Sequence, residues 1–336
     1  MAETILEVRD LAFSFDTYAG EVQAVRGVSF HVEAGETLAI VGESGCGKSV
    51  TVQSIMRLVP TPPGRLKAGS VRYLGEEITA LADREMARLR GRHMSMIFQD
   101  PMTCLNPTMR VGNQIAEGIC RHQHIAHSAA LARAQQMLGK VGIPSPARNA
   151  SRYPHQFSGG MRQRVMIAMA LCESPKLLFA DEPTTALDVT TQAQILRLME
   201  DLKGEFGASV VLITHDLGVV ARVSQRVAVM YAGKIVETGS ARDIFYAARH
   251  PYTQGLLRST PHRGGAKEKQ LLTIPGAPPD LFAPPAGCGF MPRCPHAMRV
   301  CRTHQPAQTE AEPGHYVSCW LQDARAPQGE VPRDAF

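Results

Sequence analysis

The chain contains no apolar run that approaches the ~18 to 20 consecutive residues needed to cross a bilayer, so we expect any membrane role to be peripheral. It also lacks a block of basic residues: the net charge is +5, and the basic residues are spread along the sequence. This distribution does not favour a nucleic-acid-binding protein. Residues 1–10 show no basic segment followed by an apolar one, which predicts a cytoplasmic protein without a secretory leader.

Internal repeats and coiled-coil heptads are absent as well, and apolar strand-like runs instead alternate with helical stretches up to about residue 250. We expect strands at 6–8, 38–41, 94–98, 177–180, 210–214 and 226–231, and helices at 129–141, 161–173 and 193–205. This alternation is typical of an α/β fold with a largely parallel sheet and phosphate chemistry at the carboxyl ends of its strands.

Proline marks a change of character along the chain, since 12 of its 23 prolines lie after residue 260. Apolar periodicity fades over the same stretch. We therefore place a boundary near 245–260, with one domain at 1–250 and a proline-rich extension at 251–336.

Residues 42–49 read GESGCGKS, the pattern GxxxxGK followed by Ser, between an apolar run (37–41) and a helix-compatible stretch (50–58). Glycines let such a loop curl so that its N–H groups converge on a phosphate, while Lys48 reaches the β/γ oxygens and Ser49 ligates Mg²⁺. The segment predicts a site for ATP or GTP. The residues we assign to it are Gly42, Glu43, Ser44, Gly45, Cys46, Gly47, Lys48, Ser49 and Val50.

Two carboxylates, Asp181 and Glu182, end the apolar run at 177–180. A carboxylate at the tip of a buried strand can hold Mg²⁺, and the residue after it can act as general base for an attacking water. The alternative is that the pair only starts a turn at Pro183. The phosphate loop upstream favours the catalytic interpretation.

A serine and two glycines, Ser158, Gly159 and Gly160, open a predicted helix, and such a helix end attracts anions. Alone, this segment is more often a loop before a helix. His215 likewise follows the apolar run at 210–214 and could be an ordinary surface histidine. The order and spacing of all these segments favour function for both.

Together these segments resemble the nucleotide-binding subunit of an ATP-binding cassette (ABC) transporter, over about residues 1–250. The resemblance implies a P-loop NTPase fold with a RecA-like core, an antiparallel β-subdomain and a helical subdomain. It implies that two such domains pack head to tail with ATP between them. The resemblance implies that 42–49 is the Walker A loop, 158–161 the signature segment and 186–188, with Asp188, the D-loop. It implies that Gln99 is the Q-loop glutamine and Asp181 the Walker B aspartate, and that both contribute to the Mg²⁺ site. It also implies that Glu182 is the catalytic base and that His215 is the switch histidine that contacts the γ-phosphate.

The signature departs from the usual family form by having Phe157 for Leu and Met161 for Gln, both outside its Ser-Gly-Gly core. Phe15, with Tyr18 as second choice, is expected to stack on adenine, although either could simply pack against the β-subdomain. The resemblance also places a contact with a permease at about residues 100–120.

Four of the eight cysteines, Cys288, Cys294, Cys301 and Cys319, fall close together in the extension, separated by five, six and seventeen residues. Disulfides are rare in cytosolic proteins, so this group suggests metal or cluster ligation. The spacing is unlike the paired C-x2-C of zinc ribbons, and thiolates in an irregular loop suit an iron–sulfur cluster.

The extension resembles the C-terminal part of the dipeptide, oligopeptide and nickel branch of ABC importers, which implies a 4Fe-4S cluster on the four cysteines. Zinc, free thiols, or a mixed site with His296, His304 or His315 remain alternatives. A structural role for the metal, as a clasp on a segment with little apolar core, is favoured over redox or iron sensing.

The resemblance as a whole implies an ATPase that powers a peptide importer from the cytoplasmic face of the membrane. Its implied partners are a second, non-identical ATPase, two permease subunits and, indirectly, a substrate-binding protein. Nickel, opine or glutathione import stays open. A soluble ABC ATPase acting on DNA or ribosomes would need a long coiled coil or a second cassette, and an iron–sulfur sensor with a vestigial ATPase would need a damaged Glu182 or His215; the sequence shows neither.

Overall fold

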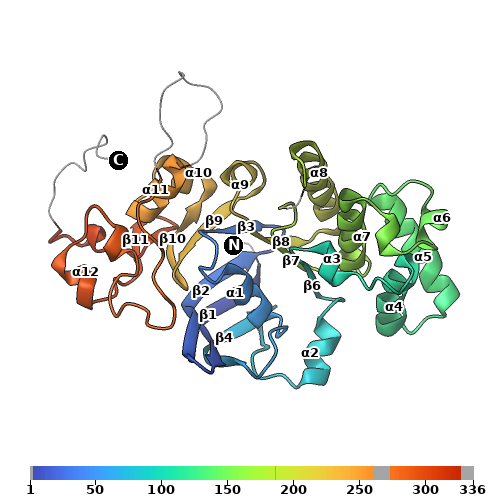
Figure 1. The fold of residues 1–336 in the computed structure, drawn as a ribbon, viewed down its shortest axis with the longest axis horizontal. Helices are drawn as coiled ribbons and strands as arrows, with labels where there is room; N and C mark the ends of the chain where they lie inside the picture. Colours follow the sequence, from blue (N-terminus) through green and yellow to red (C-terminus); the bar gives the residue numbers. More distant parts are fainter. Residues whose placement is uncertain (1–2, 186, 260–272, 327–336) are drawn as a thin grey trace. The chain divides into compact units, whose positions relative to one another are not determined.

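The computed structural model describes residues 3–185, 187–259 and 273–326 (Figure 1). These residues fall into two compact units. Unit 1 comprises Met1–Ile5, Val32–Thr37 and Leu74–Ile213, and unit 2 comprises Leu6–His31, Leu38–Tyr73 and Thr214–Phe336. Residue 250 is not a boundary between these units, because the extension belongs to the same unit as the phosphate loop.

Three parallel strands form the centre of unit 1, in the order β8-β7-β6. They are β6 (Met94–Ile97), β7 (Leu177–Asp181) and β8 (Ser209–Ile213). All of their residues are buried, as expected for parallel strands covered on both faces. Their short apolar sequences therefore specify buried strands.

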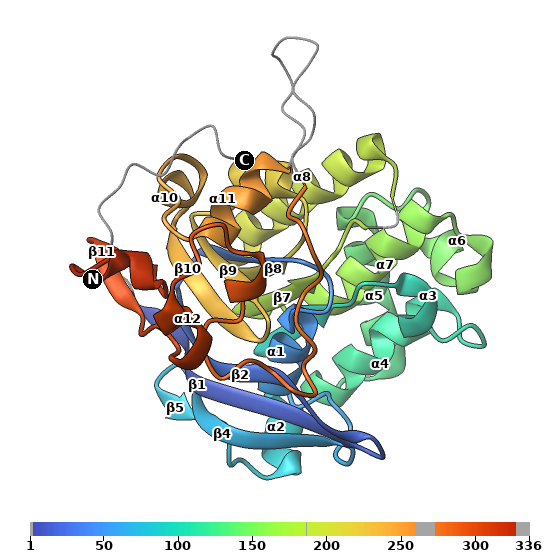
Figure 2. The same cartoon turned by 60° about the vertical axis from the view of Figure 1, so that its left-hand side comes forward.

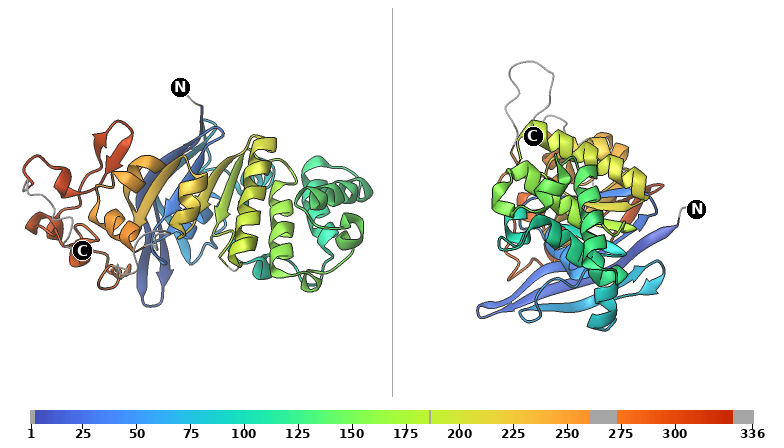
Figure 3. Two further views of the ribbon diagram at one scale, coloured as in Figure 1. Left: turned by 90° about the horizontal axis from the view of Figure 1, so that it is seen from above. Right: turned by 90° about the vertical axis from the view of Figure 1, so that its right-hand side faces the viewer.

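Helices make up most of the rest of unit 1. They are α2 (Asp83–Leu89), α3 (Pro101–Cys104), α4 (Val111–Gln123), α5 (His127–Lys140), α6 (Pro146–Ala150), α7 (Gly159–Leu171) and α8 (Val189–Phe206). In α5 the buried residues Ala130, Ala134, Met137 and Leu138 recur at helical spacing. Helices α4, α5 and α6 lie together as one group (Figure 1 and Figure 3, left).

Long antiparallel strands form one layer of unit 2, with β1 between β2 and β4 (Figure 2). They are β1 (Thr4–Thr17), β2 (Gly20–Glu33) and β4 (Gly64–Tyr73). The register of β1 with β4 runs from Leu6 opposite Tyr73 to Phe15 opposite Gly64. This layer fits the antiparallel β-subdomain implied by the sequence.

A second group of strands in unit 2 has the order β11-β12-β10-β9-β3. These strands are β3 (Thr37–Val41), β9 (Arg226–Tyr231), β10 (Lys234–Ser240), β11 (Thr309–Glu312) and β12 (His315–Val317). Because β12 pairs with β10, the extension continues the sheet that holds the phosphate loop.

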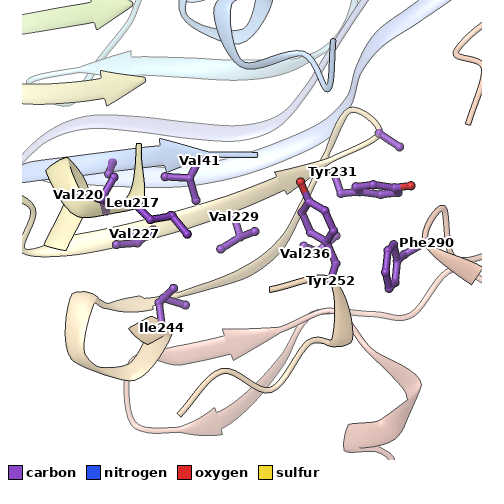
Figure 4. Packing of buried hydrophobic residues seen from close by; sticks show 12 residues of the cluster. Val41, Leu217, Val220, Val227, Val229, Tyr231, Val236, Ile244, Tyr252 and Phe290 are labelled. Carbon is purple, nitrogen blue, oxygen red and sulfur yellow. The ribbon is translucent and has the colours of Figure 1, made fainter. Parts of the chain in front are cut away.

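The remaining helices of unit 2 are α1 (Lys48–Ile55), α9 (Leu217–Val223), α10 (Ala241–Tyr246), α11 (Pro251–Arg258) and α12 (Arg299–Thr303). Side chains of β9, α9, α10 and α11 form a buried core (Figure 4). Phe290 of the extension packs into this core against Tyr231 and Tyr252, with ring centroids 5.3 and 5.4 Å away.

The predicted α/β fold is confirmed, and all the expected strands and helices end within four residues of their predicted ends, apart from the longer β1. The sequence did not predict strands β2, β4, β10, β11 and β12, or the two-residue strand β5 (Glu76–Glu77). No helix in the described stretches is both long and apolar enough to cross a membrane.

Candidate functional site

The phosphate loop joins β3 to α1 in unit 2, and two of its glycines are required by close backbone approaches. A Cβ on Gly42 would lie 2.1 Å from the carbonyl oxygen of Met230, and one on Gly47 would lie 2.3 Å from that of Ala24. Gly47 also has a φ of 101°, which favours glycine. The loop is thus pressed against its neighbours, and only glycine fits at these two positions.

Lys48 is buried at the start of α1, and its Nζ donates hydrogen bonds of 2.9 Å to the carbonyl oxygens of Gly42 and Glu43. The ammonium group therefore lies against the loop backbone, where it could neutralise the charge of a bound phosphate. Ser44 and Gly45 are exposed, whereas Cys46 is buried. Burial raises the pKa of the Cys46 thiol, which keeps the thiol uncharged.

Glu182 follows β7 in unit 1 and has a φ of 45°, an uncommon value for a non-glycine residue. One carboxylate oxygen accepts hydrogen bonds from Gln99 Nε2 at 3.0 Å and from Thr185 Oγ1 at 2.8 Å. Asp181, directly before it, is only 2% exposed at the carboxyl end of the strand. The structure thus brings three predicted residues together (Gln99, Asp181 and Glu182), and adds Thr185.

Ser158 caps α7 and its Oγ accepts a hydrogen bond from the Met161 N–H at 3.3 Å. Ser158 and Gly159 are exposed, so the N-terminus of this helix is accessible to a ligand. Phe157, directly before Ser158, is buried. The departure from Leu at this position is therefore accommodated by packing.

Gln163, which we did not single out from the sequence, is buried on α7. Its Nε2 donates a 2.6 Å hydrogen bond to the carbonyl oxygen of Pro183, the residue after Glu182. Helix α7 and the end of β7 that carries Glu182 are therefore joined by one side chain.

The other predicted nucleotide contacts have local roles in the structure. Asp188 caps α8 by accepting a 2.9 Å hydrogen bond from the Thr191 N–H. Phe15 is half-buried and packs edge-on to Phe13 at 5.6 Å, while Tyr18 is fully exposed. The roles assigned to Asp188, Phe15, Val50 and His215, which precedes α9, stay predictions, and Ala186 lies outside the described residues.

The four extension cysteines line one small cavity together with His250, His296 and Phe290. Burial raises the pKa of Cys288, of Cys294 to about 11 and of Cys319 to about 12, so that these thiols are protonated in the absence of a metal. The cavity nevertheless does not form a site for a single ion: in the stretches that the structure describes, no three His, Cys, Asp or Glu side chains are placed to hold one. The predicted metal site is therefore not shown.

Comparison with known proteins shows the family to which the chain belongs. The ABC transporter family profile matches residues 25–185, and the profile of the C-terminal region of oligopeptide/dipeptide transporters matches residues 236–301. The oligopeptide transport ATP-binding protein OppD of Bacillus subtilis (strain 168) is 56% identical over 98% of this chain and 92% of its own length. This chain belongs to the ABC transporter ATP-binding proteins.

Further relatives agree. The dipeptide transport ATP-binding protein DppD of Bacillus subtilis (strain 168) is 55% identical over 99% of both chains. Among solved structures, the ATP-binding cassette MJ0796, a dimer in a post-hydrolysis state bound to ADP and Pi, matches with a TM-score of 0.64 and 26% identity over 71% of this chain and 99% of its own. The chain is accordingly an ATP-hydrolysing subunit coupled to transport.

Proposed function

We propose that this chain hydrolyses ATP to power the import of peptides through partner permeases. The observation that carries the proposal is the pairing of a complete ATPase motif set with an extension that matches the oligopeptide/dipeptide transporter profile. The relatives named for oligopeptide and dipeptide transport span nearly the whole chain. Nickel chelates, opines and glutathione are the competing solutes.

In the proposed mechanism Glu182 accepts a proton from the water that attacks the γ-phosphate. The hydrogen bonds from Gln99 and Thr185 fix the orientation of its carboxylate. Lys48 neutralises phosphate charge and His215 contacts the γ-phosphate. Ser49, Gln99 and Asp181 would hold Mg²⁺, which when bound neutralises charge on the phosphate oxygens; buried Asp181 is a suitable carboxylate donor.

We further propose that the chain works as one of two ATPases packed head to tail, the partner being a non-identical chain, at the cytoplasmic face of the membrane. The exposed cap of α7, formed by Ser158 and Gly159, supports this arrangement because it can meet a phosphate bound to another subunit. Residues 100–120 would meet a permease, and exposed Met102 is available for that contact.

The extension is proposed to carry a 4Fe-4S cluster on Cys288, Cys294, Cys301 and Cys319. Their shared cavity supports this proposal, because a cluster spaces its four sulfur ligands further apart than a single ion does. His250, which also lines the cavity, has a buried Nε2 with no hydrogen-bond partner among the described residues, and a cluster sulfur could accept from it. The bound cluster would mainly clasp a segment that has little regular structure.

The deciding experiment is purification of the tagged chain from anaerobically lysed membranes, with iron, sulfide and zinc measured on the same sample. Two permeases, a second ATPase and about four irons per chain would support the proposals together. Uptake of labelled dipeptides and oligopeptides by the reconstituted complex, with nickel chelates and glutathione as competitors, identifies the solute class. A metal-free chain without membrane partners would contradict both the importer and the cluster.

The cluster has a separate test in Cys301→Ser, with Cys120→Ser as the matched control outside the extension. We expect Cys301→Ser to lose most iron and sulfide and the visible absorption, because three thiolates do not hold the cluster firmly. Equal iron content in the two variants would contradict ligation by Cys301.

A further inference from the structure

The carboxylate of Glu43, the second residue of the phosphate loop, is bound by an arginine 250 positions later in the chain. Arg293 Nη1 and Nη2 lie 2.7 and 3.0 Å from its two oxygens. This two-pronged geometry matches the planar guanidinium to the planar carboxylate. The ion pair lies entirely within unit 2, because both residues belong to it.

Arg293 has several partners besides Glu43, so the pair is not a mobile surface contact. Its side chain is 5% exposed, against 24% for that of Glu43. The guanidinium also donates to the carbonyl oxygens of Pro275 and Ile274 and to Tyr231 Oη. It lies 5.8 Å from the centre of the Tyr231 ring. Because Arg293 is itself fixed by these contacts, it can hold the Glu43 carboxylate in one position.

A guanidinium group stays protonated in proteins, so Arg293 donates its hydrogen bonds to Glu43 and Tyr231 as a charged group. The arginine is therefore a permanent cation beside the loop. Because it is buried, removal of its partner would leave an uncompensated charge.

The backbone at the same position of the loop is fixed from a second direction. The N–H of Glu43 donates a 2.9 Å hydrogen bond to Tyr252 Oη on α11. The carbonyl oxygen of Glu43 accepts from Lys48 Nζ. The rings of Tyr252 and Tyr231 pack at 4.5 Å in the core that also takes in Phe290 (Figure 4). Side chain, N–H and carbonyl of one loop residue are thus all engaged, two of them by groups after residue 250.

We propose that Arg293 is a positioning residue for ATP binding, which holds the phosphate loop of its own chain open and curled through Glu43. Pre-organisation of the loop lowers the cost of ordering it around the phosphates. The extension then forms part of the nucleotide site. The proposal rests on the ATPase function alone and does not depend on the transported solute.

The test uses the full-length chain with Arg293→Gln, Glu43→Gln and the double variant, and measures the Kd for MgATP together with KM and kcat of the assembled complex. We expect each single variant to weaken ATP binding by about tenfold while kcat changes by less than about threefold. The double variant should be no worse than either single one, because both substitutions break the same contact. Arg293→Lys should restore part of the affinity.

Arg325→Gln is the matched control, because Arg325 also pairs with a carboxylate in the extension, Asp323, but is 86% exposed. It should leave Kd and KM unchanged. Thermal stability and iron and sulfide content are recorded on the same samples, so that loss of a cluster is distinguished from loss of the ion pair.

Unchanged Kd and KM in Glu43→Gln would overturn the proposal, even if Arg293→Gln lowered stability, since that pattern describes an arginine that only supports the fold. Additive effects in the double variant would also overturn it. If Arg293→Gln fails to fold, Glu43→Gln still tests the proposal, because it changes the half-buried partner and keeps Arg293.

Discussion

The ATP-handling segments and the cysteine-rich extension are organised in opposite ways. The phosphate loop and the Glu182 segment each follow a short buried strand, so local sequence decides where they form. The extension has only short helices and strands and is held by single side chains that reach far along the chain. Local sequence and backbone geometry thus form the ATP-handling segments, whereas a few long-range polar contacts hold the extension in place.

Glu237 is the clearest example of such a contact. It lies on β10, is completely buried, and accepts hydrogen bonds from the backbone N–H groups of Arg249 and His250 at 2.7 and 3.0 Å. His315 Nε2 lies 2.8 Å from the same carboxylate. One buried carboxylate therefore ties the chain before α11 and the last hairpin of the extension to the sheet.

The largest effect that we predict is in Glu182→Gln, which removes the proposed base but keeps an oxygen that can accept from Gln99. ATP hydrolysis should fall by at least about 100-fold while ATP binding and thermal stability are retained. Glu205→Gln, at an exposed position near the end of α8, is the control and should hydrolyse ATP normally. Wild-type turnover in Glu182→Gln would refute its role as base.

Lys48→Ala should weaken ATP binding by about 10- to 100-fold, because charge-assisted hydrogen bonds to the phosphates are lost. Titration with a fluorescent ATP analogue measures the change. Lys234→Ala, elsewhere in the same unit, is the comparison variant. An unaltered Kd in Lys48→Ala would argue against the phosphate-loop assignment.

Glu237→Ala should lower the free energy of unfolding by about 3 kcal/mol, because it leaves two backbone N–H groups and His315 without their acceptor. Hydrogen exchange should speed up in β12 and around His250 before it does in β7. Glu312→Ala, which breaks only the exposed pair with Arg249, should have little effect. If hydrogen exchange instead accelerated equally throughout the chain, Glu237 would not act mainly by holding the extension to the sheet.

The smallest effect that we predict is in Phe15→Ala, where loss of stacking on adenine should raise the Kd for ATP about three- to tenfold. Tyr18→Ala is the matched variant at the second candidate residue. A larger loss in Tyr18→Ala would exchange the two assignments, and no loss in either would place the adenine contact elsewhere.

Sequence patterns could locate the motif residues because each motif is contiguous, and all of them except the Ser158–Gly160 segment follow an apolar run. The strands β6 to β8 and β9 were predicted for the same reason, whereas β2, β4 and β10 mix polar and apolar residues without a clear apolar run. The ion pair of Glu43 with Arg293 could not be predicted, because nothing periodic joins residues so far apart. Tyr252 and Gln163 were missed likewise, since their roles depend on tertiary packing.

The pairing of β10 with β12 also has a consequence for how the protein is made. Strand β10 is synthesised well before its partner, because Glu237 lies opposite Val317 in the sheet. Until the ribosome has released that later segment, β10 presents an open hydrogen-bonding edge to other nascent chains. A premature stop between these strands would therefore leave the edge of β10 permanently unpaired, which favours aggregation of the fragment.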